Sequence, residues 1–301
     1  MVRQGARVVA LYFVVLVSIP SGVGAQGLGN CALYAASSGP TSGNPALVEL
    51  YPTTGAVLRT VATLSAGLGA LAQNPLTGAV YGVTAPGGAG TRNLVVVDLR
   101  SGALTTIGSV GLGNFGIADI AFRADGTLFA WSENSDDAIR INLTTGAGTV
   151  IGNAGVSTRG SGIEFLADGR LLLTGNNSNG ALRQVDTTTG LTTVIGTLTG
   201  AAVTGMPVNA LTLGPDGNLW ASQLTTFPVG AGGPSQTALI RINPATAVVT
   251  NIGPGINRMD ALAWICAAPV PTTSDWALWM MAAALIAVGT WQIRRRRHVM
   301  V

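Results

Sequence analysis

Residues 139–152 read IRINLTTGAGTVIG, and this stretch decides the fold because close copies of it recur along the chain. Each copy has a short β-type run, a turn built on Thr-Gly or a near variant and, in all but the first copy, a second run that ends near Ile-Gly. The copies begin at Leu47, Leu94, Ile139, Leu182 and Leu239, so successive copies are 43 to 57 residues apart. A period of this length is typical of repeat architectures.

A second pattern lies between these copies and consists of an apolar run, a tight turn, and a run that carries an aromatic residue or Leu. Asp-Gly forms the turn at 125–126, 168–169 and 216–217, and Thr77-Gly78 takes its place once. Asp-Gly favours two-residue hairpin turns because both of its residues tolerate positive φ. Each repeat therefore supplies four strands in two hairpins, which predicts one blade of a β-propeller.

The two ends of the repeat region complete each other. Residues 261–264 have the first-strand pattern without a hairpin partner after them, and residues 32–35 have the second-strand pattern without a partner before them. We therefore expect a ring closed by strands from both ends of the chain. The count predicts an all-β propeller with five blades of four strands. Six blades are the alternative if the stretch from Thr225 to Gln236 contains further strands.

The two cysteines fit this closure. Aligning the ends with a complete repeat places Cys266 at the position of Pro215 and Cys31 at the position of Gly217, in the hairpin turn of the closing blade. The chain is interrupted at that turn, so we predict that a disulfide between Cys31 and Cys266 replaces the missing connection. An exported protein permits this bond, and the entropic account of cross-links gives it about 4–5 kcal/mol of stabilisation.

A separate C-terminal segment combines a polar motif, an apolar run and a basic cluster. Residues 270–276 read VPTTSDW, no charge occurs from Ala277 to Ile293, and Arg294 to Arg297 follow. The apolar run is just long enough for a membrane helix, and the arginines fix its far end on the cytoplasmic side. The chain before the helix would then lie outside the cytoplasm.

The order of these parts resembles the IPTL-CTERM family of bacterial sorting tails, relatives of the PEP-CTERM tails, over about Val270 to Arg297. The family motif is Ile-Pro-Thr-Leu-Ser-Glu-Trp. Here Thr273 replaces its Leu, and the other motif positions are Val270, Pro271, Thr272, Ser274, Asp275 and Trp276. The resemblance implies recognition and processing by an exosortase-type membrane enzyme. It implies nothing about the body of the protein.

The N-terminus has the pattern of a signal peptide. Arg3 and Arg7 precede an apolar stretch, and Val23-Gly24-Ala25 offers a small-residue cleavage site. The chain is therefore divided into a signal peptide (1–25), a propeller (26–268), a linker with the sorting motif (269–276), a transmembrane helix (277–293) and a basic cytoplasmic tail (294–301). We expect an exported protein of the bacterial envelope or cell surface.

Composition excludes several function classes. Six of the 16 basic residues, all arginines, lie at the chain ends, which leaves ten arginines against 13 acidic residues elsewhere. The high calculated pI therefore gives no support to nucleic-acid binding. The single His is His298 in the tail, so a Ser-His-Asp triad or a His-ligated zinc site in the body is excluded.

One set of polar side chains could carry chemistry. The residues that precede the apolar run of each first strand are Gly69, Asp119, Glu164, Asn209 and Asp260. First strands line the axis of a propeller, so the four polar members, Asp119, Glu164, Asn209 and Asp260, could form a ring of oxygen ligands for Ca²⁺. Carboxylates with separated pKa values could also perform acid–base work. The alternative is that these groups bond to backbone N–H groups of neighbouring blades.

These observations favour a non-enzymatic surface protein that binds a carbohydrate or a protein. The rival interpretation is a metal-assisted hydrolase or lyase that acts on a glycan through Asp119, Glu164 and Asp260. A purely structural spacer is a third interpretation.

Overall fold

The computed structural model describes residues 31–39, 45–85, 92–112, 116–132, 134–158, 160–175, 180–200, 206–226 and 236–267. The predicted signal peptide, sorting motif, membrane helix and basic tail lie outside these residues. Within the described part of the chain, no helix has the length and apolar character needed to cross a bilayer.

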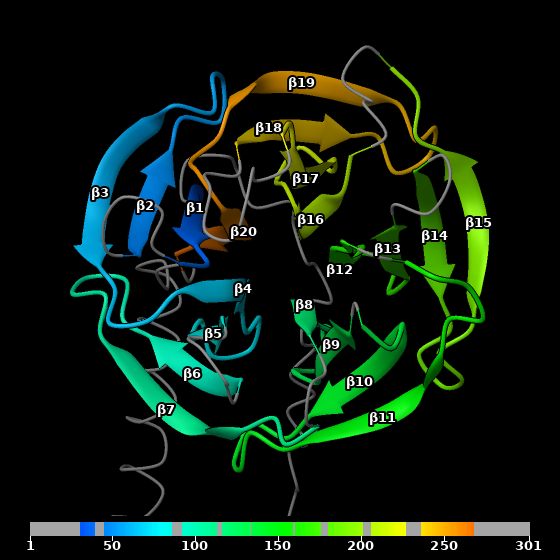
Figure 1. The fold of residues 1–301 in the computed structure, drawn as a ribbon, viewed down its shortest axis with the longest axis horizontal. Helices are drawn as coiled ribbons and strands as arrows, with labels where there is room; N and C mark the ends of the chain where they lie inside the picture. Colours follow the sequence, from blue (N-terminus) through cyan, green and yellow to red (C-terminus); the bar gives the residue numbers. More distant parts are fainter. Residues whose placement is uncertain are drawn as a thin grey trace, which may run out of the picture.

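Twenty strands form five antiparallel four-stranded sheets around a central axis (Figure 1). The first blade consists of β4 (Leu68–Gln73), β5 (Val80–Thr84), β6 (Asn93–Val97) and β7 (Leu104–Ser109). The second consists of β8 (Ile117–Phe122), β9 (Leu128–Ser132), β10 (Asp137–Ile141) and β11 (Gly148–Asn153). The third consists of β12 (Ile163–Phe165), β13 (Leu171–Gly175), β14 (Ala181–Val185) and β15 (Thr192–Thr197). The fourth consists of β16 (Val208–Leu213), β17 (Leu219–Leu224), β18 (Thr237–Ile242) and β19 (Val249–Pro254).

The closing blade joins the two ends of the repeat region, as predicted. Its strands follow the order β20 (Met259–Cys266), β1 (Cys31–Ser37), β2 (Ala46–Leu50) and β3 (Val57–Thr63). The last strand of the described chain therefore pairs with the first one (Figure 1). The prediction of five blades is confirmed, and the described residues contain no sixth sheet.

Burial changes from the inner to the outer strand of each blade. The inner strand β8 is buried along nearly its whole length, whereas the outer strand β7 exposes most of its Thr and Ser side chains. The apolar clusters lie between neighbouring sheets; for example, Leu94 of the first blade packs in one cluster with Ile120 of the second. This arrangement explains why the first and second strands of the repeat are mostly apolar and the outer strands are mixed.

The recurring Ile-Gly and Thr-Gly pairs meet at the borders between blades. A Cβ atom added to Gly108 at the end of β7 would collide with the backbone at Thr145, and one added to Gly146 would collide with Gly108. The same approach recurs around the ring: Gly152 meets Thr189 and Gly190, and Gly253 meets Thr54 and Gly55. The repeat motif therefore marks close backbone contact between an outer strand and the next outer hairpin turn.

Candidate functional site

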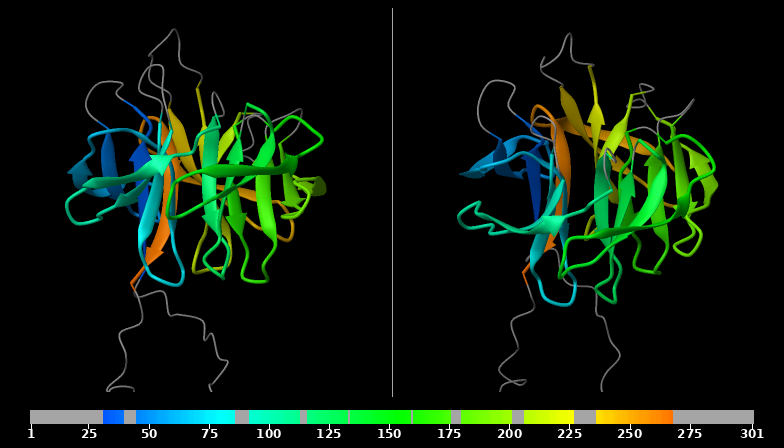
Figure 2. Two further views of the ribbon diagram at one scale, coloured as in Figure 1. Left: turned by 90° about the horizontal axis from the view of Figure 1, so that it is seen from below. Right: turned by 60° about the horizontal axis from the view of Figure 1, so that its bottom comes forward.

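A cavity of about 210 Å³ opens at one end of the propeller axis. It is lined by Ser38, Gly69, Ala85, Arg92, Ile117, Ala118, Asn209, Arg258 and Asp260. These residues come from the closing, first, second and fourth blades. The cavity lies where β20 begins, and β20 runs through the depth of the ring to Cys266 at the opposite face (Figure 2). The cavity and the two ends of the described chain are therefore on opposite faces.

The guanidinium group of Arg92 lies beside Gly69, in van der Waals range of the position that a Cβ atom would take there. Gly69 has no side chain, and a Cβ added to it would lie 3.6 Å from Nη1 of Arg92. The same nitrogen donates a hydrogen bond to the Ile117 carbonyl oxygen at 3.1 Å. Arg92 therefore connects the first and second blades at the wall of the cavity.

Arg258 contributes the second guanidinium group from an unusual backbone conformation. Its φ is +52°, in the left-handed region that residues other than Gly, Asn and Asp seldom adopt. Its carbonyl oxygen accepts a hydrogen bond from the Ser38 N–H at 3.1 Å, which fixes the turn before β20 against the chain that follows β1. Both Arg92 and Arg258 also have interactions beyond these.

Asn209 and Asp260 form the polar pair of the cavity. The Asn209 side-chain amide donates a hydrogen bond to Oδ1 of Asp260 at 2.9 Å, across the border between the fourth and closing blades. Each residue lies at a β-bulge of its inner strand, where the pairing register shifts. The bulges turn these two side chains toward the cavity and away from regular pairing.

Asp119 lies deeper, next to Ala118 of the cavity wall, and is completely buried. Its Oδ2 accepts hydrogen bonds from the N–H groups of Ile163 at 3.0 Å and Leu211 at 2.8 Å, and its Oδ1 accepts one from Ile120. The carboxylate thus lies among the inner strands of three blades. Burial raises the pKa of Asp119 well above its usual value, although the three backbone N–H groups oppose the rise.

Glu164 has a related role. Its Oε1 accepts a hydrogen bond from the Phe165 N–H at 2.7 Å, and its Oε2 accepts one from the Leu213 N–H at 3.2 Å in the next blade. The side chain keeps some accessible surface, but the protein around the carboxyl group raises the pKa of Glu164 to about 7, chiefly by desolvation. The hydrogen bonds to the carboxylate oppose this shift without cancelling it.

The structure separates the four predicted oxygen ligands, since Asn209 and Asp260 line the cavity whereas Asp119 and Glu164 are not among its lining residues. Asn209 and Asp260 lie at bulges, Asp119 follows a bulge at Ala118, and Glu164 lies in the regular part of its ladder opposite Leu172. Asp119 and Glu164 accept hydrogen bonds from backbone N–H groups of neighbouring blades. This matches the alternative interpretation, in which the polar groups connect the blades. The described residues contain no group of three or more His, Cys, Asp or Glu that could hold a metal ion.

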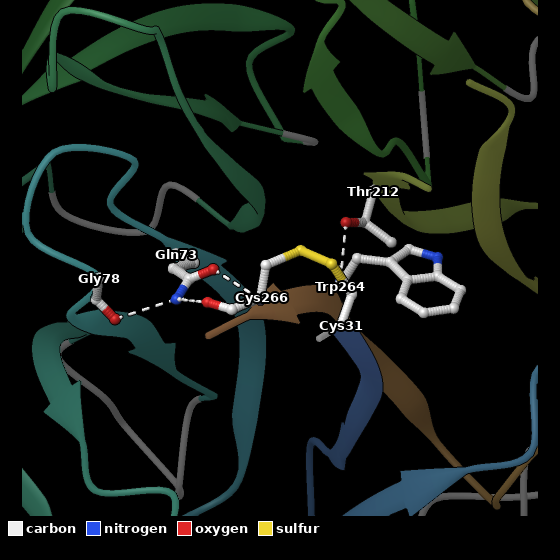
Figure 3. Close-up of a disulfide and its surroundings, with 6 residues drawn as sticks. All are labelled: Cys31, Gln73, Gly78, Thr212, Trp264 and Cys266. Atoms are coloured by element: carbon white, nitrogen blue, oxygen red, sulfur yellow. Dashed lines mark hydrogen bonds between the residues drawn. A yellow bond between two sulfur atoms is a disulfide. The ribbon is translucent and has the colours of Figure 1, made fainter. Parts of the chain in front are cut away.

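The opposite face carries the disulfide that the sequence predicts. Cys31 and Cys266 pair directly in the β1–β20 ladder and are joined by an S–S bond, with their Cα atoms 3.9 Å apart (Figure 3). Gln73 of the first blade bonds to the backbone of Cys266. Its side-chain amide donates a hydrogen bond to the Cys266 carbonyl oxygen and accepts one from the Cys266 N–H. The ring is therefore closed by a covalent bond and by a side chain of the neighbouring blade.

A family described as a repeat of unknown function (DUF6923) matches residues 30–207. The chain belongs to this family. The match covers the closing blade's first described strands and the next three blades, so the propeller of this DUF6923 protein extends beyond the matched segment into the fourth blade and β20. No curated protein matches the chain by sequence.

Two solved structures are similar to this chain at low sequence identity. A chain from a crystal structure of a nidogen/laminin complex is 15% identical, with a TM-score of 0.51, and the match covers 78% of this chain and 98% of that one. TolB from Acinetobacter baumannii is 15% identical with a TM-score of 0.47, and the match covers 79% of this chain and 67% of TolB. The first likeness supports the fold of the DUF6923 protein and nothing further.

Sequence reasoning missed both arginines of the cavity. Arg92 precedes β6 and Arg258 precedes β20, so neither falls within the repeated motifs. One feature of the sequence pointed to Arg92. Four of the five first strands carry a polar residue at the aligned position, whereas the first blade has Gly69 there, and Arg92 lies beside this glycine. The positive φ of Arg258 has no counterpart in the sequence pattern.

Proposed function

We propose that the protein is an exported propeller, tethered to a membrane by its C-terminal segment, that binds a ligand without catalysing a reaction. The observation that carries this proposal is the position of the polar cavity on the face opposite Cys31 and Cys266. A tether that continues from Cys266 would leave the cavity directed away from the membrane. The disulfide supports export, because such bonds persist in oxidising compartments.

The rival hydrolase or lyase would use Asp119, Glu164 and Asp260. Such an enzyme needs a carboxyl group within hydrogen-bonding reach of its substrate. Asp119 is fully buried and its oxygens accept three backbone hydrogen bonds, so no substrate could reach it without opening the ring. Of the described residues that line the cavity, one is a carboxylate, Asp260, and two are arginines. This set suits recognition better than glycoside cleavage by paired carboxylates.

Fractionation of a bacterial host that expresses the full chain tests the tether. We expect the full chain in the membrane fraction, released by detergent but not by high salt, with both cysteines oxidised. A variant that ends at Ala267 should be recovered as a soluble protein outside the cytoplasm, still with its disulfide. Full-length protein found in the cytosol with free thiols would contradict export.

A further inference from the structure

We propose that the axial cavity binds the carboxylate of an acidic sugar, of the uronic acid class. This inference deepens the proposed function and rests on it for the exposure of the cavity to extracellular glycans. The cavity combines guanidinium groups, which suit an anion, with amide, hydroxyl and carboxylate groups, which suit sugar hydroxyls.

The charges of the lining favour an anion. Among the described lining residues, Arg92 and Arg258 are positively charged and Asp260 is negatively charged, and Asn209 donates to the Asp260 carboxylate. Guanidinium groups bind carboxylates through two parallel N–H···O bonds, which gives direction as well as attraction. Arg92 donates a hydrogen bond to the Ile117 carbonyl oxygen, which restricts its side chain before a ligand binds. The loss of side-chain entropy on binding is therefore small.

The backbone at Arg258 has a conformation that arginine seldom adopts. Gly adopts positive φ without steric cost, whereas Arg at +52° retains a conformational penalty. Of the described residues other than Gly, only Asp136, Ala247 and Arg258 have positive φ, and Arg258 alone lines the cavity. An arginine in a position that suits glycine is explained if its guanidinium group serves the cavity.

The remaining lining selects a small polyhydroxylated ligand. Asn209, Asp260 and Ser38 offer donors and acceptors for hydroxyl groups, and Gly69, Ala85 and Ala118 leave space by having small side chains or none. The volume of about 210 Å³ is below the range of about 300–1,000 Å³ for drug-sized ligands, so one sugar unit fits better than an oligosaccharide chain. The described lining residues include no aromatic side chain, so binding through them would depend on charge and weaken with salt.

Calorimetry on the full chain in detergent tests the proposal with galacturonate and glucuronate as probes. Galactose, glucose and inorganic sulfate are the comparison ligands. We expect a uronate to bind, the neutral sugars to bind at least tenfold more weakly, and sulfate to compete poorly because it lacks hydroxyl groups. Equal binding of sulfate, or of the neutral sugars, would overturn the proposal, as would the absence of binding by either uronate.

Two variants and one control separate binding from folding. Arg258→Gly removes the guanidinium group and relieves the backbone, so it should keep or raise the melting temperature while weakening uronate binding about ten- to a hundredfold. Arg92→Gln should weaken binding by a similar factor. Arg100→Gln changes an exposed arginine of an outer turn and should leave affinity unchanged. Full affinity in Arg258→Gly would overturn the assignment. Because these measurements use purified protein, a failure to bind uronate is distinct from a failure of the membrane tether.

Discussion

Gln73 and Cys266 exchange two hydrogen bonds although they are 193 positions apart in the chain (Figure 3). Nε2 of Gln73 donates to the Cys266 carbonyl oxygen and Oε1 accepts from the Cys266 N–H, both at 2.9 Å. Nε2 also donates to the Gly78 carbonyl oxygen at 3.1 Å. An amide is the only common side chain that can donate and accept in this way. The contact ties the end of β4 to the end of β20, beside the disulfide.

Replacing Gln73 by Glu should destabilise the ring more than replacing it by Ala. The carboxylate keeps the acceptor but loses the donor, and it would face the carbonyl oxygens of Gly78 and Cys266. Leaving such buried groups unpaired costs about 1–3 kcal/mol, or several degrees in melting temperature. Thermal melts of Gln73→Glu and Gln73→Ala provide the measurement. Equal melting temperatures for the two variants would show that the donor does not matter.

Removal of the disulfide should lower stability without changing the fold. The bond joins residues separated by 235 positions, and the entropic account gives about 5 kcal/mol for a loop of this length. The double variant Cys31→Ala/Cys266→Ala should therefore melt roughly 10–20 °C lower, with an unchanged β-sheet circular dichroism spectrum at low temperature. Peptide mapping of the unreduced parent should recover the Cys31–Cys266 pair, and free thiols there would contradict the structure.

Asp119→Asn should destabilise the protein although it preserves size and shape. Three backbone N–H groups point at the two carboxylate oxygens, and an amide offers only one oxygen, so at least one donor would face an NH₂ group. We expect a loss of about 1–3 kcal/mol. Asp186→Asn is the matched control, because Asn142 and Asn243 already fill the same turn position in other blades. Equal melting of both variants would refute the role given to Asp119.

Stability should fall as pH rises from about 5 to about 8. Glu164 has a pKa of about 7 in the fold against 4.5 for the free side chain, so the folded state binds more protons than the unfolded state between these values. The contribution of Glu164 to the free energy of unfolding is complete below the pKa of the free side chain. It is lost as the pH rises through the pKa of the folded state, and it amounts to at most about 3 kcal/mol. The raised pKa of Asp119 acts in the same direction.

Thermal melts across this range measure the effect. Glu164→Gln should flatten the pH profile, whereas Asp168→Asn, at a turn where a backbone hydrogen bond from Arg170 lowers the pKa of the carboxyl, should leave it unchanged. The turn aspartates Asp98, Asp168 and Asp186 have lowered pKa values and act only at more acidic pH. A profile that rises between pH 5 and 8 would contradict the burial of Glu164.

Gly152→Ala should be more damaging than Gly196→Ala, although both glycines occupy the same position of an outer strand. A Cβ at Gly152 would collide with the Thr189 carbonyl oxygen, whereas one at Gly196 would lie 3.3 Å from the Cβ of Ala247. Forcing atoms into a filled space costs about 1–3 kcal/mol, and the second site needs only a small shift. Similar losses in chemical denaturation would show that the contact between blades tolerates a side chain.

The fold could be predicted because each blade repeats its own chemistry. Thr-Gly turns, Ile-Gly strand ends and Asp-Gly hairpins recur in order, and the unpaired patterns at residues 32–35 and 261–264 define the closure. The same alignment brought Cys31 and Cys266 together, and the structure confirms this pair.

The site could be predicted only in part because register is set by bulges that the sequence does not reveal. Bulges shift the register next to Asp119, Asn209 and Asp260; Asn209 and Asp260 line the cavity, whereas Asp119 and Glu164 accept hydrogen bonds from backbone N–H groups. Arg92 and Arg258 come from segments outside the repeats, and only the three-dimensional ring brings them within one cavity.

The disulfide also makes residues 31–266 a single covalent circle. A protease that cuts one connection between strands would not release a fragment, because both pieces stay joined through the sulfur atoms. The product would be a circularly permuted propeller, with new ends at the cut and its paired strands still in place. Such a molecule needs two cuts, or one cut and a reductant, before it can come apart.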